Sequence, residues 1–481
     1  MNPYIVIGII LSYFSLLIIV SLLTSRKADT QTFFTGNRKS PWYIVAFGMV
    51  GTTISGVTFI SVPGEVGNSA FSYLQFIMGN IVGFWIVAGV LLPLYYRMNL
   101  VSIYSFLNQR LGEYSHKTGS FFFLISKLIG ASFRLYLVAG VLQIAFFDAF
   151  NIPFAITVVV TLALVWVYTQ KGGIKTIIWT DSLQTLFLII AVIFTIVTVA
   201  KTLNWNIIEL VGRITESPRS QIFFWDWRSE NNFFKQFFAG VFITIAIVGM
   251  DQDMMQKNLT CKNIKDAQKN MFVFSFLFFI TVTLFLSLGA MLYSFTDNLN
   301  IEIPANTDDL YPMLALKYLG LPVGIAFLLG ITAAAYSSAD SALTALTTSF
   351  SIDFLKIEKY EEDKRRRVKR WTHLMFSALM ILIILLFRAM NNDSIVVAVF
   401  KVAGYTYGPI LGLFIFGLYI KRKVADRWVP IVAILSPVIT FFISKYSVVL
   451  FNGYQFGFEL LIVNGFITLF GLLLISKKFE S

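Results

Sequence analysis

The sequence contains little that could support chemistry by cysteine or histidine. Its single cysteine, Cys261, excludes a disulfide framework and any multi-cysteine metal site. The only two histidines, His116 and His373, fall in or beside segments expected on the cytoplasmic side, so a membrane hydrolase or acyltransferase would lack its usual intramembrane general base. Charged residues make up 13% of the 481 residues and hydrophobic residues 57%, which excludes a soluble globular protein. We therefore expect an all-α polytopic membrane protein.

About 13 apolar windows of about 20 residues are long enough to cross a bilayer as helices. They lie near 4–23, 43–60, 71–94, 120–150, 153–168, 177–200, 237–255, 272–293, 321–350, 372–387, 395–419, 429–443 and 456–475. An odd number of spans places the two termini on opposite sides. Most of the 38 Lys and Arg residues fall in the loops of one side, and by the positive-inside rule that side is cytoplasmic. The sequence thus predicts a multi-pass protein of the cell membrane with its N-terminus outside and its C-terminus inside.

The net charge of +12 would also suit a nucleic-acid-binding protein. However, the basic residues are scattered among short loops, and no soluble segment offers them a common face. We expect the lipid bilayer as a partner and no nucleic acid, and the sequence leaves the oligomeric state open.

A run of small and hydroxyl residues, Thr332 to Ser349, occupies a segment that should span the membrane. On a helix Ser337, Asp340 and Ser341 share one face through their i+3 and i+4 spacing. An isolated charge at mid-bilayer costs about 2.5–3.5 kcal/mol on insertion scales, so Asp340 needs a local partner, most simply a cation or water. Oxygen ligands along one stripe suit a hard cation.

A second unusual stretch runs from Gly51 to Thr58 and is followed by Pro63 and Gly64. Its glycines and hydroxyl residues weaken a helix, and a broken helix frees backbone carbonyls. Carbonyls that face hydroxyls of another helix are how many secondary transporters hold sodium near the midplane. The alternative is a tightly packed crossing of helices with small residues.

Three further charged positions lie within or at the ends of spans. Asp181 lies about five residues inside its span, where an acid is either capped by water near the interface or part of an ion path. Arg134 lies far from both ends of its span, which favours an inward-facing role, and its guanidinium suits a carboxylate of a substrate or of the protein. Lys127, nearer the cytoplasm, is expected to snorkel.

The stretch Gly249 to Lys257 ends a span on the cytoplasmic side. Its acids, Asp251 and Asp253, stand near Lys257 in the sequence. We expect salt bridges at the membrane interface here, each worth little.

These motifs together resemble the sodium:solute symporter family. The resemblance rests on Gly51 to Thr58 with Pro63, on Gly173 to Asp181, on Asp251 to Gln256 and on Ala333 to Thr344, in this order over nearly the whole chain. It implies one transporter domain, 1–481, with a leucine-transporter-like fold. This fold would comprise a leading helix (about 4–23), two inverted five-helix repeats (about 43–200 and 237–419) and two trailing helices (about 429–475).

The resemblance also implies residues for the ions and for the solute. The main sodium site would use the carbonyls of Gly51, Ile54 and Ala334 and the hydroxyls of Ser337 and Ser338. A second sodium site, present in some members, would use Asp181, Ser337, Asp340 and Ser341. Asp340 stands where the two-sodium sialic acid transporters have serine, so the number of ions stays open. The positions that match the substrate cavity are Ser55, Thr58, Asn80, Arg134 and Thr244.

The implied function is sodium-coupled secondary active symport that imports a small organic solute by alternating access, with Na+ as the only cofactor. Because Arg134 matches the arginine that meets the substrate carboxylate in sialic acid transporters, a carboxylate such as a sialic acid or a monocarboxylate is expected. The alternative is a sodium/sugar symporter, or one for another neutral solute. A channel or transport-like sensor, and an intramembrane enzyme with Asp181 and Asp340 as an acid pair, are competing classes, and we expect no enzyme.

Overall fold

The computed structural model of the protein describes residues 3–25, 30–390 and 395–478, which are almost entirely helical. Among these residues, nine helices are long and apolar enough to cross a membrane, some of them extended by a short helical turn. They are α1 (Pro3–Ser25), α5 (Tyr73–Ile86) with α6 (Leu92–Arg97), α8 (Glu113–Ala145), α10 (Ile174–Thr202), α14 (Ile264–Leu299), α16 (Leu321–Ser349), α17 (Glu362–Met390), α18 (Ile395–Tyr419) and α19 (Val429–Lys445). Two shorter apolar helices are α9 (Phe154–Gly172) and α21 (Leu460–Leu474). The expected all-helical membrane architecture is confirmed, whereas the number of crossings stays a prediction.

Two further apolar segments are broken helices. The first consists of α3 (Trp42–Thr53) and α4 (Gly56–Ser69), whose axes differ by 62°. The second consists of α12 (Phe233–Thr244), its π-helical extension η5 (Ile245–Gly249) and α13 (Gln252–Asn258), with a bend of 71°. Non-helical backbone at membrane depth is tolerated only where protein or a cavity satisfies its polar groups. Both breaks therefore mark places where functional groups can gather.

The remaining elements are short connections. They are α2 (Thr30–Thr35), α7 (Ser105–Arg110), α11 (Ile207–Glu216), α15 (Leu310–Met313), α20 (Ser447–Leu450) and the antiparallel strands β1 (Arg422–Val424) and β2 (Ser476–Lys478). The 3₁₀ turns are η1 (Gly36–Arg38), η3 (Phe147–Phe150), η4 (Pro218–Ser220), η6 (Thr307–Asp309), η9 (Ile357–Lys359) and η10 (Asp426–Trp428). The other π-helical turns are η2 (Val87–Leu91), η7 (Leu314–Tyr318) and η8 (Phe350–Phe354).

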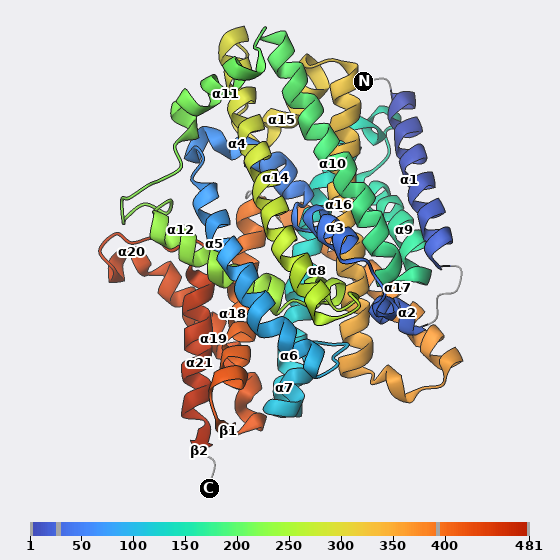
Figure 1. The fold of residues 1–481 in the computed structure, drawn as a ribbon, viewed down its shortest axis with the longest axis vertical. Helices are drawn as coiled ribbons and strands as arrows, with labels where there is room; N and C mark the ends of the chain where they lie inside the picture. Colours follow the sequence, from blue (N-terminus) through green and yellow to red (C-terminus); the bar gives the residue numbers. More distant parts are fainter. Residues whose placement is uncertain (1–2, 26–29, 391–394, 479–481) are drawn as a thin grey trace.

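Helix α16 lies at the centre of the molecule. It packs against α10, α8 and α3, and every residue from Gly330 to Ser349 is buried. Figure 1 shows α1, α9 and α17 on one side of this centre and α18, α19 and α21 on the other. The serine-rich stretch is therefore shielded from lipid by its neighbours, which lets its hydroxyls serve as ligands for groups inside the protein.

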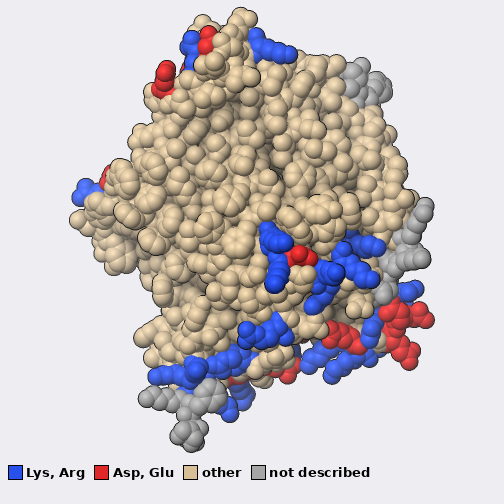
Figure 2. Space-filling model, in the orientation of Figure 1, with Lys and Arg blue, Asp and Glu red and all other residues tan. Residues whose placement is uncertain are grey.

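Basic side chains gather at one end of the molecule. Figure 2 shows Lys and Arg concentrated around the end that carries β1, β2 and α7, whereas the wide apolar belt above it carries few charges. This asymmetry is the one that the positive-inside rule uses. The chain ends themselves, residues 1–2 and 479–481, lie outside the described residues, and the orientation with the N-terminus outside stays a prediction.

Candidate functional site

The break between α3 and α4 frees backbone carbonyls in the middle of the molecule. The Ser55 N–H would complete the helix by bonding to Gly51, but it donates to the Thr53 carbonyl instead, at 3.1 Å. The first backbone bond that closes α4 runs from Phe59 N–H to the Ser55 carbonyl, at 3.0 Å. The carbonyls of Gly51 and Ile54 thus lie outside the regular hydrogen-bond ladder of either helix, as the glycine- and hydroxyl-rich sequence predicts.

Two hydroxyls of α16 face this break. Ser338 Oγ donates to the Thr52 carbonyl at 3.4 Å and to the Ala334 carbonyl of its own helix at 3.1 Å. Ser337 Oγ lies 3.2 Å from Thr52 Oγ1. Both serines are buried, at 0% and 3% exposure. Backbone carbonyl and hydroxyl oxygens are a donor set that fits a sodium ion, so the residues expected for the main sodium site are chemically compatible with it.

A glycine sets the distance between α3 and α10. The Gly51 N–H donates to Thr185 Oγ1 at 3.0 Å, and a Cβ added at Gly51 would overlap with that same oxygen. Only a residue without a side chain allows this approach. The close packing brings Thr52, next along the chain, to Asp181 on the neighbouring turn of α10.

Asp181 is the centre of a buried polar network. Its Oδ2 accepts from Lys257 Nζ at 2.7 Å, from Thr52 Oγ1 at 2.9 Å and, more weakly, from Ser341 Oγ at 3.4 Å. Its Oδ1 accepts from Ser337 Oγ at 2.6 Å. Lys257 is 1% exposed, so the expectation that this lysine forms a weak salt bridge at the membrane interface is wrong. The bend of 71° before α13 turns the lysine inward instead.

Asp340 has a separate partner. Its Oδ2 accepts from the Tyr168 hydroxyl of α9 at 2.7 Å, and its buried Oδ1 has no hydrogen-bond partner among the described residues. Ser337 and Ser341, which flank it on the helix, both donate to Asp181. Asp181, Ser337 and Ser341 are thus brought together, whereas Asp340 bonds to Tyr168 and makes no hydrogen bond to Asp181 in the described structure.

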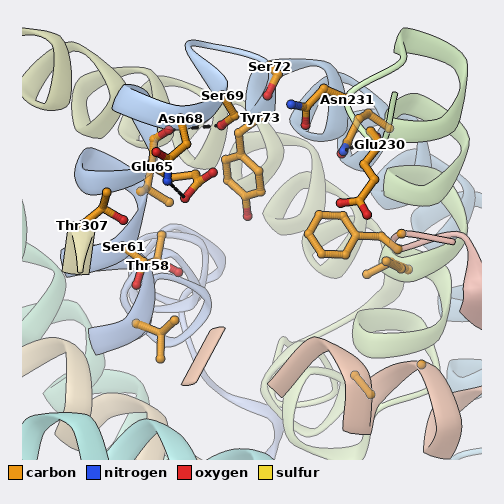
Figure 3. Close-up of a pocket in the computed structure, with 18 of the residues that line it drawn as sticks. Thr58, Ser61, Glu65, Asn68, Ser69, Ser72, Tyr73, Glu230, Asn231 and Thr307 are labelled. Carbon is orange, nitrogen blue, oxygen red and sulfur yellow. Dashed lines mark hydrogen bonds between the residues drawn. The ribbon is translucent and has the colours of Figure 1, made fainter. Parts of the chain in front are cut away.

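A cavity of about 730 Å³ opens beside α4, α5 and the loop that precedes α12. Figure 3 shows Glu65 of α4 and Glu230 of the loop on different walls, with the Tyr73 side chain between them. Asp308 also lines the cavity, and no Lys, Arg or His does so in the part of the chain that the structure describes. Partial burial raises the pKa of the Asp308 carboxyl, and the nearby Asp309 adds to this effect.

Of the residues expected to bind the solute, Thr58 lines this cavity. Asn80 and Thr244 meet each other in the interface of α5 and α12, where the Asn80 amide, oriented to donate, lies 3.1 Å from Thr244 Oγ1. Ser55 is buried at the helix break, ahead of α4. Thr58 therefore lies on the cavity wall, whereas Ser55, Asn80 and Thr244 lie in the helix packing outside the cavity lining.

Arg134 lies away from the cavity lining. It is half-buried on α8 and close enough to Lys127, Asp253 and Tyr407 to act on them electrostatically. Among the described residues no acidic side chain lies within ion-pair distance of it. A guanidinium at this depth without a bonded carboxylate is available for an anionic group.

Lys127 takes part in a buried ion-pair cluster and does not snorkel as expected. Its Nζ lies 2.8 Å from Asp253 Oδ2 and 3.2 Å from Asp251 Oδ2, and its side chain is 10% exposed. The Tyr407 hydroxyl of α18 donates to Asp251 as well. The cluster joins α8, α18 and the second helix break.

Sequence reasoning missed the roles of Lys257 and Tyr168. The signal for Lys257 is Asp253, four residues earlier and on the same face of a helix, 3.9 Å from the lysine in the structure. No local signal marks Tyr168, because its contact with Asp340 joins positions 172 residues apart.

Comparisons with known proteins show which transporters this chain resembles. A sodium/sialic acid symporter of Aliivibrio fischeri is 24% identical over 83% of this chain and 80% of its own length. Sodium-coupled monocarboxylate transporter 1 of Xenopus laevis is 25% identical over 82% of this chain and 63% of its own length. The solved structure of a Na+-coupled sialic acid symporter in a substrate-bound outward-open state has a TM-score of 0.84 at 19% identity, covering 98% of this chain and 99% of that one.

The structural likeness confirms the leucine-transporter-like fold that the sequence motifs imply. The sequence model of the sodium:solute symporter family matches residues 33–426, which is most of the chain. The chain therefore belongs to the sodium:solute symporter family.

Proposed function

We propose that this sodium-coupled symporter imports a small organic solute by alternating access and that its main sodium ion binds between α3 and α16. The observation that carries the site is the pairing of a broken helix with the hydroxyls of Ser337 and Ser338 across from it. The ligands would be the carbonyls of Gly51, Ile54 and Ala334 and the hydroxyls of Ser337 and Ser338. The bound ion would supply positive charge at the freed carbonyls. Membership of this family makes the chain a transporter rather than an enzyme.

Coupling follows from what the ion would hold together. The carbonyls of the break lie at the end of α3 and the hydroxyls on α16, so a bound ion would bridge these two helices. An ion that binds more tightly when α3 and α16 are close together stabilises that conformation relative to the others. This difference in ion affinity between conformations is what couples sodium binding to solute binding. Thr58, one turn after the break, lies on the cavity wall, so ordering of the break also orders the start of the solute cavity.

For the solute we favour a carboxylate. The relatives named above transport sialic acid or monocarboxylates by their names, and Arg134 has no ion-pair partner among the described residues. A guanidinium binds a carboxylate through two parallel hydrogen bonds. Arg134 would have to reach the solute at the inner end of the cavity, and Ser55, Thr58, Asn80 and Thr244 would surround it from α4, α5 and α12.

A specific observation favours a second candidate, a neutral or amine-bearing solute. Glu65, Glu230 and Asp308 line the cavity, and no basic side chain lines it in the described part of the chain. Carboxylates at a cavity mouth repel anions and attract hydrogen-bond donors and cations. A sugar or a zwitterion would suit this outer part better than a simple anion.

A sodium-dependent thermal-shift screen separates the two candidates. Purified protein would be melted in NaCl or in choline chloride with sialic acid, lactate, their amides, proline and hexoses. A ligand that binds the folded state raises the melting temperature by mass action. A carboxylate solute is expected to raise it only in sodium, with the matching amide inactive and the effect lost in Arg134→Met.

The exposed Arg427, remote from the cavity, provides the matched control Arg427→Met. A shift that survives Arg134→Met, or that amides and hexoses produce equally well, would favour the neutral solute. The proposal would be contradicted if no solute shifted the melting temperature in sodium and if proteoliposomes also took up no ²²Na+ in the presence of any solute.

We also propose that residues 1–481 form one transporter domain in the cell membrane, with the N-terminus outside. The gathering of basic residues at one end supports this orientation. Accessibility of single cysteines introduced at the exposed positions Glu209 and Arg427 to an impermeant thiol reagent tests it, because Glu209 should react from outside and Arg427 only after permeabilisation.

A further inference from the structure

A buried lysine lies within the oxygen-rich site at which a second sodium ion was expected. Lys257 Nζ is 2.7 Å from Asp181 Oδ2 and also donates to Thr52 Oγ1. Both partners are buried, Asp181 at 0% and Thr52 at 5% exposure. The Lys257 ammonium is thus already in contact with the Asp181 carboxylate. That carboxylate would have to be the main charged ligand of a second sodium ion.

The other donors around this carboxylate use most of its lone pairs. Ser337 Oγ donates to Oδ1 at 2.6 Å, while Thr52 and Ser341 donate to the oxygen that also accepts from the lysine, at 2.9 and 3.4 Å. Each carboxylate oxygen has about two lone-pair sites, so Oδ2, which accepts from three donors, has none left, whereas Oδ1 accepts from Ser337 alone. The oxygen that meets Lys257 is therefore not available to a metal ion in this arrangement.

Electrostatics point in the same direction. A sodium ion on Asp181 would lie beside the Lys257 ammonium, and two like charges repel most strongly where water is excluded. The second acid, Asp340, bonds to Tyr168 and makes no hydrogen bond with the lysine in the described structure. The residues present do not fit a second sodium ion while Lys257 is in place.

We propose that Lys257 is a tethered cation that takes the place of a second sodium ion, so that this transporter carries one sodium ion per cycle. The proposal rests on the proposed function, because it assumes a separate main sodium site. Unlike a bound ion, the ammonium cannot leave with the solute. It neutralises Asp181 throughout the cycle and contributes to stability rather than to coupling.

The wild-type protein gives the first test. Equilibrium binding of ²²Na+ to purified protein should count one ion per chain, and the sodium dependence of the melting temperature should follow a Hill coefficient of about 1. Two ions per chain in the wild type would overturn the proposal. This measurement does not depend on whether any variant folds.

Variants of the lysine give the second test. Lys257→Met leaves Asp181, Asp340 and the hydroxyls of Ser337 and Ser341 without a resident cation, so it is expected to bind one ion more than the wild type. Lys257→Arg keeps the charge and should bind the same number as the wild type. Lys257→Met combined with Asp181→Asn removes both charges and should also show no extra ion.

The outcomes separate this proposal from the proposed function. A wild type that binds no sodium contradicts the main site, and the extra ion in Lys257→Met would still support the tethered cation. A folded Lys257→Met protein that gains no ion, or a Lys257→Arg protein that gains one, overturns it. If Lys257→Met does not fold, the wild-type count and the Lys257→Arg count decide.

Discussion

Ser337 Oγ lies 2.6 Å from Asp181 Oδ1 and donates to it, which joins the centre of α16 to α10 across 156 residues of sequence. The same hydroxyl lies 3.2 Å from Thr52 Oγ1 beside the helix break. One side chain therefore belongs both to the proposed sodium site and to the network that holds Asp181. Ser338, one residue later, hydrogen-bonds among the described residues to backbone carbonyls only, those of Thr52 and Ala334.

This difference predicts distinct effects of two equivalent substitutions. Ser337→Ala should weaken sodium binding and lower stability by about 1.5–3 kcal/mol, because it removes a buried hydrogen bond to a charged group. Ser338→Ala should weaken sodium binding by about tenfold, or about 1.4 kcal/mol, with little loss of stability in sodium-free buffer. Melting temperatures measured with and without NaCl separate the two. Equal sodium-free melting temperatures for both variants would contradict the assignment of Ser337 to the Asp181 network.

Gly51→Ala tests the close approach of α3 and α10. The added methyl group would overlap with Thr185 Oγ1 and lie 3.3 Å from the Thr185 Cα, so α3 must shift. Overpacking of this kind costs about 1–3 kcal/mol, and displacement of the Gly51 carbonyl should weaken sodium binding in addition. Melting temperature and its sodium dependence are the readouts.

Two controls sharpen this test. Thr185→Ala in the Gly51→Ala background removes the overlapping oxygen and should recover part of the lost stability. Gly130→Ala places a methyl group on α8 where no atom lies within 4 Å, and it should not destabilise the protein. Failure of the double variant to recover any stability would show that the overlap is not the cause.

Lys127→Met is expected to be among the most destabilising single changes on α8. It leaves Asp253 and Asp251 without the ammonium that lies 2.8 and 3.2 Å from them, and breaking a buried ion pair costs about 3–5 kcal/mol. Lys127→Met with Asp253→Asn should be more stable than Lys127→Met alone, because Asp251 keeps Tyr407 and backbone donors. A double-mutant cycle on unfolding in mild detergent measures the coupling.

The exposed pair of the same helix is the matched control. Lys117 lies 3.0 Å from Glu113, with the two side chains 46% and 53% exposed. Exposed pairs contribute about 0–1 kcal/mol, so Lys117→Met should have a small effect. Similar losses for Lys117→Met and Lys127→Met would contradict the buried role of Lys127.

The polar residues of α3 and α16 could be predicted as a cation site because their composition conflicts with an apolar surrounding. Gly51, Thr52 and Ser55 weaken the helix by local effects. The serines of α16 recur at helical spacing, so each half of the proposed site can be recognised from a short stretch of sequence. Their convergence follows from the packing of α16 on α3.

Lys257 could not be placed in the same way. A lysine near acids at the end of a span ordinarily lies at the membrane interface, and the sequence of the segment does not reveal the bend of 71° that turns it inward. The contact between Asn80 and Thr244 in the interface of α5 and α12 could not be predicted either, and their role at the solute stays a prediction. Gly240 permits this contact, since a Cβ there would overlap with the Phe76 carbonyl oxygen and lie 2.9 Å from the Asn80 side-chain amide. Such contacts depend on three-dimensional approach and leave no periodic signal.

Asp308 predicts a measurable pH dependence of stability. Partial burial raises the pKa of this carboxyl in the folded protein above the value of an unfolded chain. The folded state therefore binds the proton more tightly, so this contribution to stability is fully present below the unfolded pKa and is lost as pH rises through the folded pKa.

Asp308→Asn removes the titration and should stabilise the protein relative to the wild type at about pH 8, with the difference shrinking toward about pH 4. Melting temperatures across this range test the prediction, and Glu302→Gln, at an exposed position outside the cavity, controls for the loss of one negative charge. A difference between Asp308→Asn and the wild type that stays constant over the whole range would show that burial of the charged carboxylate is not its cause.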